Sequence, residues 1–230
     1  MSADQATGDR TGGADDVRLL IVDDHDMFAD SLRMALSAQP DFEVVGTAST
    51  IAQAKRLVAT TAPDVVLLDH QLPDGLGVDS ITDLRAIRPQ ANIVVLTAAA
   101  EDSMLVAATE AGCAGFILKT SPLDELVAAV RTAAAGEIMV SSDLLSRLLN
   151  RLHHQHQEPS SDLTAREQEI LQLNAEGLTN GAIAARLFIS VNTVRNHVQS
   201  ILAKLGAHSK LEALSVAIRD GIIDPPTASA

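Results

Sequence analysis

Five short apolar runs alternate with five helical stretches between Arg18 and Gly136, and this alternation constrains the fold more than any other feature. The apolar runs are residues 19–22, 42–45 (the weakest), 65–68, 93–96 and 116–118, and the helical stretches are 27–37, 51–60, 78–87, 104–111 and 123–135. The runs are continuous, which is typical of strands buried on both faces of a parallel sheet. The pattern therefore predicts a doubly wound α/β domain with a five-stranded parallel sheet.

The chain reads as all-helical from Leu163 onward. Thr164 and Glu167 form a capping-box pattern at the start of a first helix, which Gly177 ends. A short helix over residues 180–187 and a longer one over 191–205 follow, separated by the turn 188–190. Two short helices joined by a tight turn predict a helix-turn-helix.

These patterns divide the chain into four parts. We expect a disordered tail over residues 1–16, the α/β domain over 17–136, a helical linker over 137–160 and the all-α domain over 161–226. The linker combines leucines at helical spacing with a polar segment that holds three histidines at 153, 154 and 156. A metal-binding tract is the alternative for these histidines, but we favour a solvated linker because no cysteine or carboxylate pair completes a site.

The composition is that of a globular protein, with 47% hydrophobic and 20% charged residues. No apolar run approaches the ~18 residues that cross a bilayer, and the first sixteen residues lack a signal-peptide core. The single cysteine, Cys113, excludes an intrachain disulfide, and we expect it to be a small buried hydrophobe. These features predict a cytoplasmic protein with no membrane partner.

The net charge of −13 is distributed unevenly. Residues 1–139 hold 9 basic and 21 acidic residues (−12), 140–158 hold 2 and 2, and 159–230 hold 6 and 7 (−1). Residues 177–211 contain no acid, and their basic residues are Arg186, Arg195, Lys204 and Lys210. This stretch is the one where a polyanion such as DNA would not be repelled.

Charged or hydroxyl side chains follow the predicted strands at the point where each strand ends. They are Asp23 and Asp24 after the first, Asp69 after the third, Thr97 after the fourth and Lys119 after the fifth. If the strand order is the flavodoxin-like 2-1-3-4-5, these groups converge on the crevice where such sheets bind ligands.

Three close carboxylates ionise together only with a cation among them, and oxygen ligands of this kind suit Mg²⁺. Lys119 and Thr97 could hold the remaining oxygens of a phosphoryl group. A carboxylate can itself be the nucleophile, so Asp69 is the candidate for an aspartyl phosphate.

At this point the sequence resembles the receiver domain of two-component response regulators. The resemblance rests on Val22-Asp23-Asp24-His25, Leu68-Asp69 with Pro73 and Gly77, Leu96-Thr97-Ala98, and Phe116-Ile117-Leu118-Lys119-Thr120-Ser121-Pro122. It implies that a histidine kinase phosphorylates Asp69. It also implies that Asp24, Asp69 and the Gln71 carbonyl bind Mg²⁺, with Asp23 assisting through water, and that Phe116 swings inward when Thr97 moves toward the phosphate. His25 and His70 flank the pocket and are expected to be solvent-facing.

The predicted helix 191–205 has an apolar face for the core and a polar face with amide and guanidinium groups able to bond base edges. Through Leu163-Thr164-Ala165-Arg166-Glu167, Glu176-Gly177-Leu178-Thr179-Asn180 and Thr193-Val194-Arg195-Asn196-His197-Val198, residues 163–214 resemble the LuxR-type helix-turn-helix. With the receiver pattern, the whole chain resembles the NarL/FixJ subfamily. The resemblance implies that Arg195, Asn196 and Gln199 approach bases and that Thr179, Thr193 and Lys204 approach phosphates. Gly181 and Gln199 depart from the common pattern, which often has charged residues there, so we expect weak non-specific affinity and reliance on dimerisation.

The resulting hypothesis is a non-enzymatic response regulator whose phosphorylation on Asp69 switches sequence-specific DNA binding and transcription regulation. Its partners would be DNA, a sensor histidine kinase, a second copy when phosphorylated, and RNA polymerase as a further candidate. One alternative is a regulator that works without phosphorylation. Another is an aspartyl-phosphate phosphatase, which Gln71 disfavours because a general acid would be needed two residues after Asp69.

Overall fold

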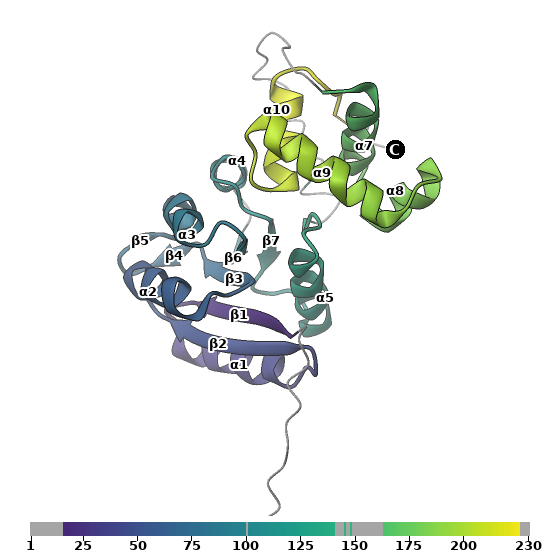
Figure 1. Ribbon diagram of the computed structural model, residues 1–230. Helices are drawn as coiled ribbons and strands as arrows, with labels where there is room; N and C mark the ends of the chain where they lie inside the picture. The colour runs from purple at the N-terminus through teal and green to yellow at the C-terminus, as the bar shows by residue number, and fades with distance from the viewer. Residues whose placement is uncertain (1–15, 100, 141–144, 146–147, 149–162, 226–230) are drawn as a thin grey trace, which may run out of the picture.

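The computed structural model describes residues 16–99, 101–140, 145, 148 and 163–225 (Figure 1). The expected tail lies outside the described residues except for Asp16. The expected linker beyond Val140 lies outside them except for Leu145 and Leu148, which are helical and buried. The histidine-rich segment therefore lies outside them too.

The N-terminal domain is built on a five-stranded sheet in the order β2-β1-β3-β6-β7, with every adjacent pair parallel. The strands are β1 (Val17–Val22), β2 (Phe42–Ala48), β3 (Val65–Asp69), β6 (Asn92–Thr97) and β7 (Gly115–Leu118). All five residues of β3 are buried, because helices cover both faces of the sheet. The predicted fold class and strand order are confirmed.

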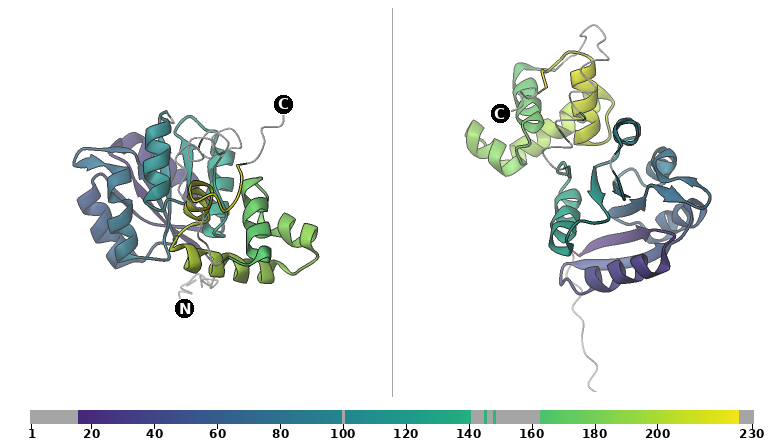
Figure 2. Two further views of the ribbon diagram at one scale, coloured as in Figure 1. Left: turned by 90° about the horizontal axis from the view of Figure 1, so that it is seen from above. Right: turned by 180° about the vertical axis from the view of Figure 1, so that it is seen from behind.

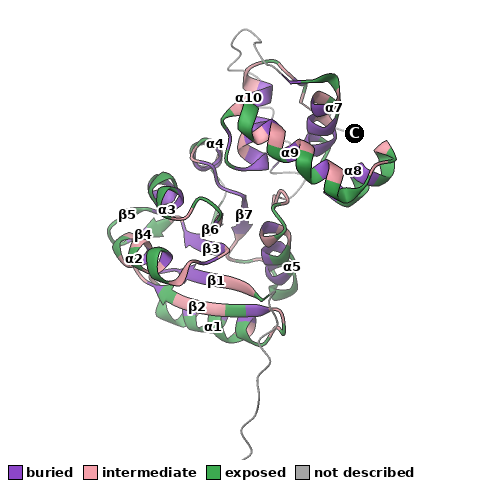
Figure 3. Ribbon diagram, in the orientation of Figure 1, coloured by how far each residue is buried: buried purple, intermediate pink, exposed green. Residues whose placement is uncertain are grey.

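Helices cover the sheet in two layers (Figures 1 and 3). The helices α1 (Asp26–Ser37) and α5 (Leu123–Ala134) pack on one face, and α2 (Ile51–Thr61), α3 (Ile81–Ile87) and α4 (Asp102–Glu110) pack on the other. Two features differ from the prediction. The expected helix 78–87 begins as a separate 3-10 turn, η1 (Gly77–Ser80), and an unexpected antiparallel pair, β4 (Gln71–Leu72) and β5 (Gly75–Leu76), precedes it.

The C-terminal domain contains α7 (Ala165–Ala175), α8 (Asn180–Leu187), α9 (Val191–Leu205) and α10 (Lys210–Arg219). Thr164 and Glu167 form the predicted capping box, and Thr179 and Ser190 cap α8 and α9. Gly177 and Gly206 have positive φ just beyond α7 and α9, where the left-handed conformation favours glycine. The buried side chains of Val194, Val198 and Ile201 place α9 in the core as expected.

The two domains pack against each other through α10 and α4 (Figures 1 and 2). Buried apolar side chains form one continuous cluster that runs from the α2–α3–α4 face of the sheet into the C-terminal domain. After α5 the chain runs along the free edge of β7, where the Phe116 N–H donates to the Met139 carbonyl at 2.8 Å. The last strand of the sheet is therefore tied to the first residues that leave the N-terminal domain.

Candidate functional site

Carboxylates from the ends of β1 and β3 converge as the sequence predicted. Carboxylate oxygens of Asp23, Asp24 and Asp69, together with a ring nitrogen of His25, lie within 4.8 Å of one another. Asp23 and Asp69 are buried, whereas the His25 side chain is 71% exposed. The strand order explains this arrangement, because β1 and β3 are hydrogen-bonded neighbours and their carboxyl ends lie side by side.

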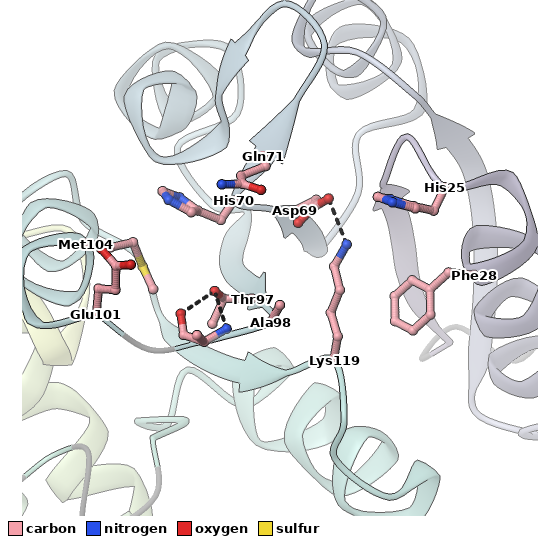
Figure 4. Close-up of a pocket in the computed structure, with 11 residues that line it drawn as sticks. His25, Phe28, Asp69, His70, Gln71, Thr97, Ala98, Glu101, Met104 and Lys119 are labelled. Atoms are coloured by element: carbon pink, nitrogen blue, oxygen red, sulfur yellow. Dashed lines mark hydrogen bonds and ion pairs between the residues drawn. The ribbon is translucent and has the colours of Figure 1, made fainter.

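Lys119 lies between two of these carboxylates, and Figure 4 shows its contact with Asp69. Its Nζ is 2.7 Å from Asp23 Oδ2 and 2.8 Å from Asp69 Oδ2, and it also lies 5.2 Å from the centroid of the Phe28 ring. Burial and the nearby charge of Asp23 raise the pKa of Asp69 despite the hydrogen bond from Lys119. Burial lowers the pKa of Lys119, but its contacts with the two carboxylates outweigh this and raise it overall.

A cavity of about 530 Å³ opens beside Asp69 and Lys119. Thr97 and Ala98 line it, as do Gln71 and Met104 (Figure 4). The Thr97 hydroxyl donates to the Ala99 carbonyl at 2.7 Å, so it is engaged with the loop that leads to α4. The space beside the small Ala98 side chain is open to an incoming group.

Gly77 lies against the backbone of Asp69. A Cβ at this position would be 1.9 Å from the Asp69 carbonyl oxygen, and the Gly77 N–H donates to the His70 carbonyl at 2.8 Å. Only glycine permits this close approach. The glycine of the sequence motif thus fixes the loop that carries Gln71 beside the carboxylates.

The chemistry of these donors fits a hard divalent cation. The site offers several carboxylate oxygens, and the polar neighbours of Asp23 Oδ2 and Asp24 Oδ1 are Lys119 Nζ at 2.7 Å and His25 Nδ1 at 2.9 Å. A cluster of anionic oxygens with few hydrogen-bond donors favours Mg²⁺ over a softer metal. Asp23, Asp24, Asp69 and the Gln71 carbonyl are the residues that could hold it.

Phe116 on β7 is 2% exposed and belongs to the α3–α4 face of the sheet. The expected switch aromatic is therefore buried while the Thr97 hydroxyl is bonded to Ala99. Phe116 shares its apolar cluster with α4, so a rearrangement of this side chain would alter the packing of α4, the helix that contacts α10.

The predicted base-reading residues of α9 are exposed, whereas the predicted phosphate contacts are already partly engaged. Arg195, Asn196 and Gln199 are exposed on α9. The hydroxyls of Thr179 and Thr193 take part in helix caps, and Lys204 Nζ is 2.7 Å from Glu167 Oε2. Burial would raise the pKa of Glu167, but hydrogen bonds from Lys204, Ser200 and Thr164 lower it to about 2.

Three of the four basic residues in the acid-free stretch have carboxylate partners from outside it. Arg186 pairs with Glu176, Lys204 with Glu167, and Lys210 with Glu137 of the segment that leaves the N-terminal domain. The local charge of +4 counted from the sequence is therefore largely neutralised in the folded chain.

The domain contact contains charged residues that sequence reasoning missed. The buried Arg85 of α3 donates to the Gly112 carbonyl at 2.6 Å and to the His208 carbonyl at 3.2 Å. Lys210 is buried as well, at the start of α10. No local pattern marks these residues, because their partners are up to 123 positions away.

The comparisons with known proteins agree with this geometry. Residues 19–131 match the family described as response regulator receiver domain, and residues 161–217 match the family of bacterial regulatory proteins, luxR family. The transcriptional regulatory protein LiaR of Bacillus subtilis is 36% identical over 210 residues, which cover 90% of this chain and 100% of that protein. This chain belongs to the two-component response regulators.

Two further relatives cover nearly the whole regulator. The DNA-binding transcriptional activator DevR/DosR of Mycobacterium tuberculosis is 36% identical over 199 residues, covering 86% of this chain and 92% of that protein. The crystal structure of the response regulator ChrA, from a heme-sensing two-component system, has a TM-score of 0.50 and 32% identity, covering 91% of this chain and 100% of that one. Among the described residues of the regulator, no helix has the length and apolarity to cross a bilayer.

Proposed function

We propose that Asp69 of this response regulator accepts a phosphoryl group from a sensor histidine kinase and that Mg²⁺ bound by Asp23, Asp24, Asp69 and the Gln71 carbonyl is required. The observation that carries the proposal is the Asp69 carboxylate in the lining of an open cavity, with Lys119 Nζ 2.8 Å away. Bound Mg²⁺ would supply positive charge beside the transferred group.

In the proposed reaction an Asp69 carboxylate oxygen attacks the phosphorus of a phosphohistidine. The new P–O bond forms as the P–N bond breaks, and the electron pair leaves with the kinase imidazole. Lys119 turns from the carboxylates toward a phosphoryl oxygen. The Thr97 hydroxyl leaves the Ala99 carbonyl and donates to a second phosphoryl oxygen. Each donor already lies in the cavity, so the rearrangement needs side-chain movement alone.

Phosphorylation would act on DNA binding through the contact between domains. Gln199 of α9 lines a groove of about 380 Å³ together with Gln90 of the receiver and Glu137 just beyond it, so part of the recognition helix faces the receiver. A shift of Thr97 and Phe116 would favour a second state in which α10 leaves α4. The phosphoryl group can shift the equilibrium only by the difference between its stabilisation of the two states. A difference of ~1–3 kcal/mol implies partial control of DNA binding.

The released form would bind DNA as a homodimer in the cytoplasm, with Arg195, Asn196 and Gln199 at base edges. The relative DevR/DosR is named a DNA-binding transcriptional activator, which supports transcription regulation as the output. The exposure of Arg195 on α9 supports a base-reading role, because the luxR-family match includes this helix.

Acetyl phosphate labelling tests the proposal. With Mg²⁺, wild type should gain one phosphoryl group by intact-mass spectrometry, and Asp69→Asn should gain none. Asp79→Asn, which changes an exposed carboxylate of η1, is the matched control and should label normally. Labelling of Asp69→Asn would contradict the assignment. If wild type labels but its DNA affinity does not respond to beryllofluoride, the regulator works without phosphorylation.

A further inference from the structure

A carboxylate from the segment that leaves the receiver after α5 is seated on the helix-turn-helix domain. Glu137 lies just beyond α5, and its Oε2 is 2.5 Å from Lys210 Nζ. Its Oε1 accepts a hydrogen bond of 3.2 Å from the Asn180 N–H at the start of α8. Lys210 Nζ also donates to Asn180 Oδ1 at 2.7 Å, which completes a closed arrangement of three residues.

The groups that hold this carboxylate are buried, so an anion is needed between them. Lys210 is 6% exposed and Asn180 is 3% exposed. Removing the anion from a buried ammonium costs several kcal/mol unless another anion or water replaces it. The Lys210 and Asn180 groups therefore form a niche, called here the anion niche, that is built for an oxyanion.

The anion niche lies beside the base-reading surface. Burial lowers the pKa of Lys210, Glu137 raises it, and the charge of Arg195 lowers it further. Lys210 and Gln199 also line the same interdomain groove. A ligand in the niche would thus be next to the residues proposed to read DNA.

The chemistry of the niche matches a DNA phosphate. The first helix of a helix-turn-helix crosses the DNA backbone, and α8 is that helix here. Its N-terminus presents backbone N–H groups, and a lysine beside them adds a full positive charge. A phosphodiester offers two anionic oxygens on one atom, as the Glu137 carboxylate does.

We propose that the anion niche of Lys210 and the Asn180 N–H binds a backbone phosphate of DNA after the domains separate, and that Glu137 occupies the niche as an internal stand-in before then. This inference rests on the proposed DNA-binding function and names one site at which the receiver and DNA compete. Phosphorylation and DNA are then coupled because the same two donors cannot serve both anions.

The position of Glu137 depends on the strand that carries Phe116 and leads to Lys119. Two residues after Glu137, the Met139 carbonyl accepts from the Phe116 N–H, and the Met139 N–H donates to the Ala114 carbonyl at 3.3 Å. A movement of β7 on phosphorylation would therefore move Glu137 relative to the niche.

The test uses the unphosphorylated full-length chain and a fluorescent DNA duplex of arbitrary sequence, about 20 base pairs long, because phosphate contacts do not depend on sequence. Anisotropy titrations over a range of salt concentrations give affinity and salt slope. Glu137→Gln should bind about tenfold more tightly than wild type. Glu125→Gln removes the same charge from an exposed position on α5 and should change affinity less than twofold.

Lys210 is then varied in the Glu137→Gln background. Lys210→Gln should lower the salt slope by about one, the loss of one phosphate contact, whereas Lys210→Arg should keep it. Circular dichroism establishes that each variant is folded. A purely structural role for Lys210 would alter stability and leave the slope unchanged, and that result would overturn the inference, as would equal effects of Glu137→Gln and Glu125→Gln.

DNA binding by beryllofluoride-loaded wild type distinguishes failure of the anion niche from failure of the proposed function. If it binds DNA but the Glu137 and Lys210 variants behave like their controls, the anion niche is wrong and the proposed function stands. If it fails to bind any DNA, the proposed function fails and the niche fails with it.

Discussion

Lys119 and Lys210 are both paired with carboxylates, but they differ in where those carboxylates come from. The partners of Lys119 are Asp23 and Asp69 of its own domain, beside an open cavity of about 530 Å³. The partner of Lys210 comes from the other domain, and the lysine is enclosed. Lys119 can reach a new anion by rotating its side chain, whereas Lys210 needs the domains to separate. A change of anion at Lys119 thus needs only a side-chain rotation, whereas a change of anion at Lys210 needs a rearrangement of the domains.

Replacing Lys119 should have the largest effect on this contrast. Lys119→Gln removes the donor that we propose for a phosphoryl oxygen, and removing one such donor costs about 100-fold or more in rate. We therefore expect acetyl phosphate to label Asp69 about 100-fold more slowly, measured by intact-mass spectrometry over time. Lys55→Gln, which breaks an exposed pair with Asp83, is the control. A loss below threefold would remove Lys119 from the transfer step.

The pair of Lys204 with Glu167 provides a third case, internal to the helix-turn-helix domain. The pKa of Glu167 is lowered to about 2, so this carboxylate stabilises the fold at pH above its ordinary value of 4.5, and the contribution is lost as pH falls toward 2. Glu167→Gln should destabilise the domain by about 1–3 kcal/mol at neutral pH, as expected for hydrogen bonds to a buried charge.

The measurement is the thermal unfolding midpoint by circular dichroism, taken from pH 7 to pH 2. The difference between wild type and Glu167→Gln should shrink as the pH falls from 4.5 to 2. Glu169→Gln on the same helix changes an exposed carboxylate and is the control. A difference that is independent of pH would mean that the charge of Glu167 does not stabilise the domain.

Gly115→Ala should have a smaller effect, and it should act on the contact between Glu137 and Lys210. A Cβ there would be 2.0 Å from the Met139 carbonyl oxygen, so the segment that carries Glu137 must move. We expect severalfold tighter DNA binding by the unphosphorylated chain, measured by anisotropy, and little further gain when Glu137→Gln is added. Gly46→Ala on β2, where a Cβ meets ordinary contacts, should leave affinity unchanged. Full additivity of the two changes would show that Met139 does not position Glu137.

Much of the receiver could be predicted because its information is local. Continuous apolar runs such as residues 65–68 give the buried strands, and a charged or hydroxyl residue directly after four of the five runs gives the pocket. Asp23, Asp69 and Lys119 meet because the sheet has the expected strand order, which places the ends of β1, β3 and β7 at the same edge. Cys113 is buried as expected, and its burial raises the pKa of the thiol to about 12.

The contact between the domains could not be predicted in the same way. Glu137 and Lys210 are 73 positions apart, and neither belongs to a pattern with a period. Counting charges over residues 177–211 therefore overstated the positive field, because Glu176, Glu167 and Glu137 all lie outside that window. The β4–β5 pair was missed because each strand has only two residues, too few for an alternating pattern.

The run of chain along β7 has a practical consequence for dissecting the protein. Met139 covers an edge strand whose backbone groups would otherwise be free to pair with another molecule. A receiver fragment that stops at Gly136 would lose this cover, and its β7 edge would become a site for aggregation. A fragment extended through Val140 would keep the bridge between Gly115 and Met139 and would carry Glu137 with it, so it could be tested in trans as a competitor of DNA.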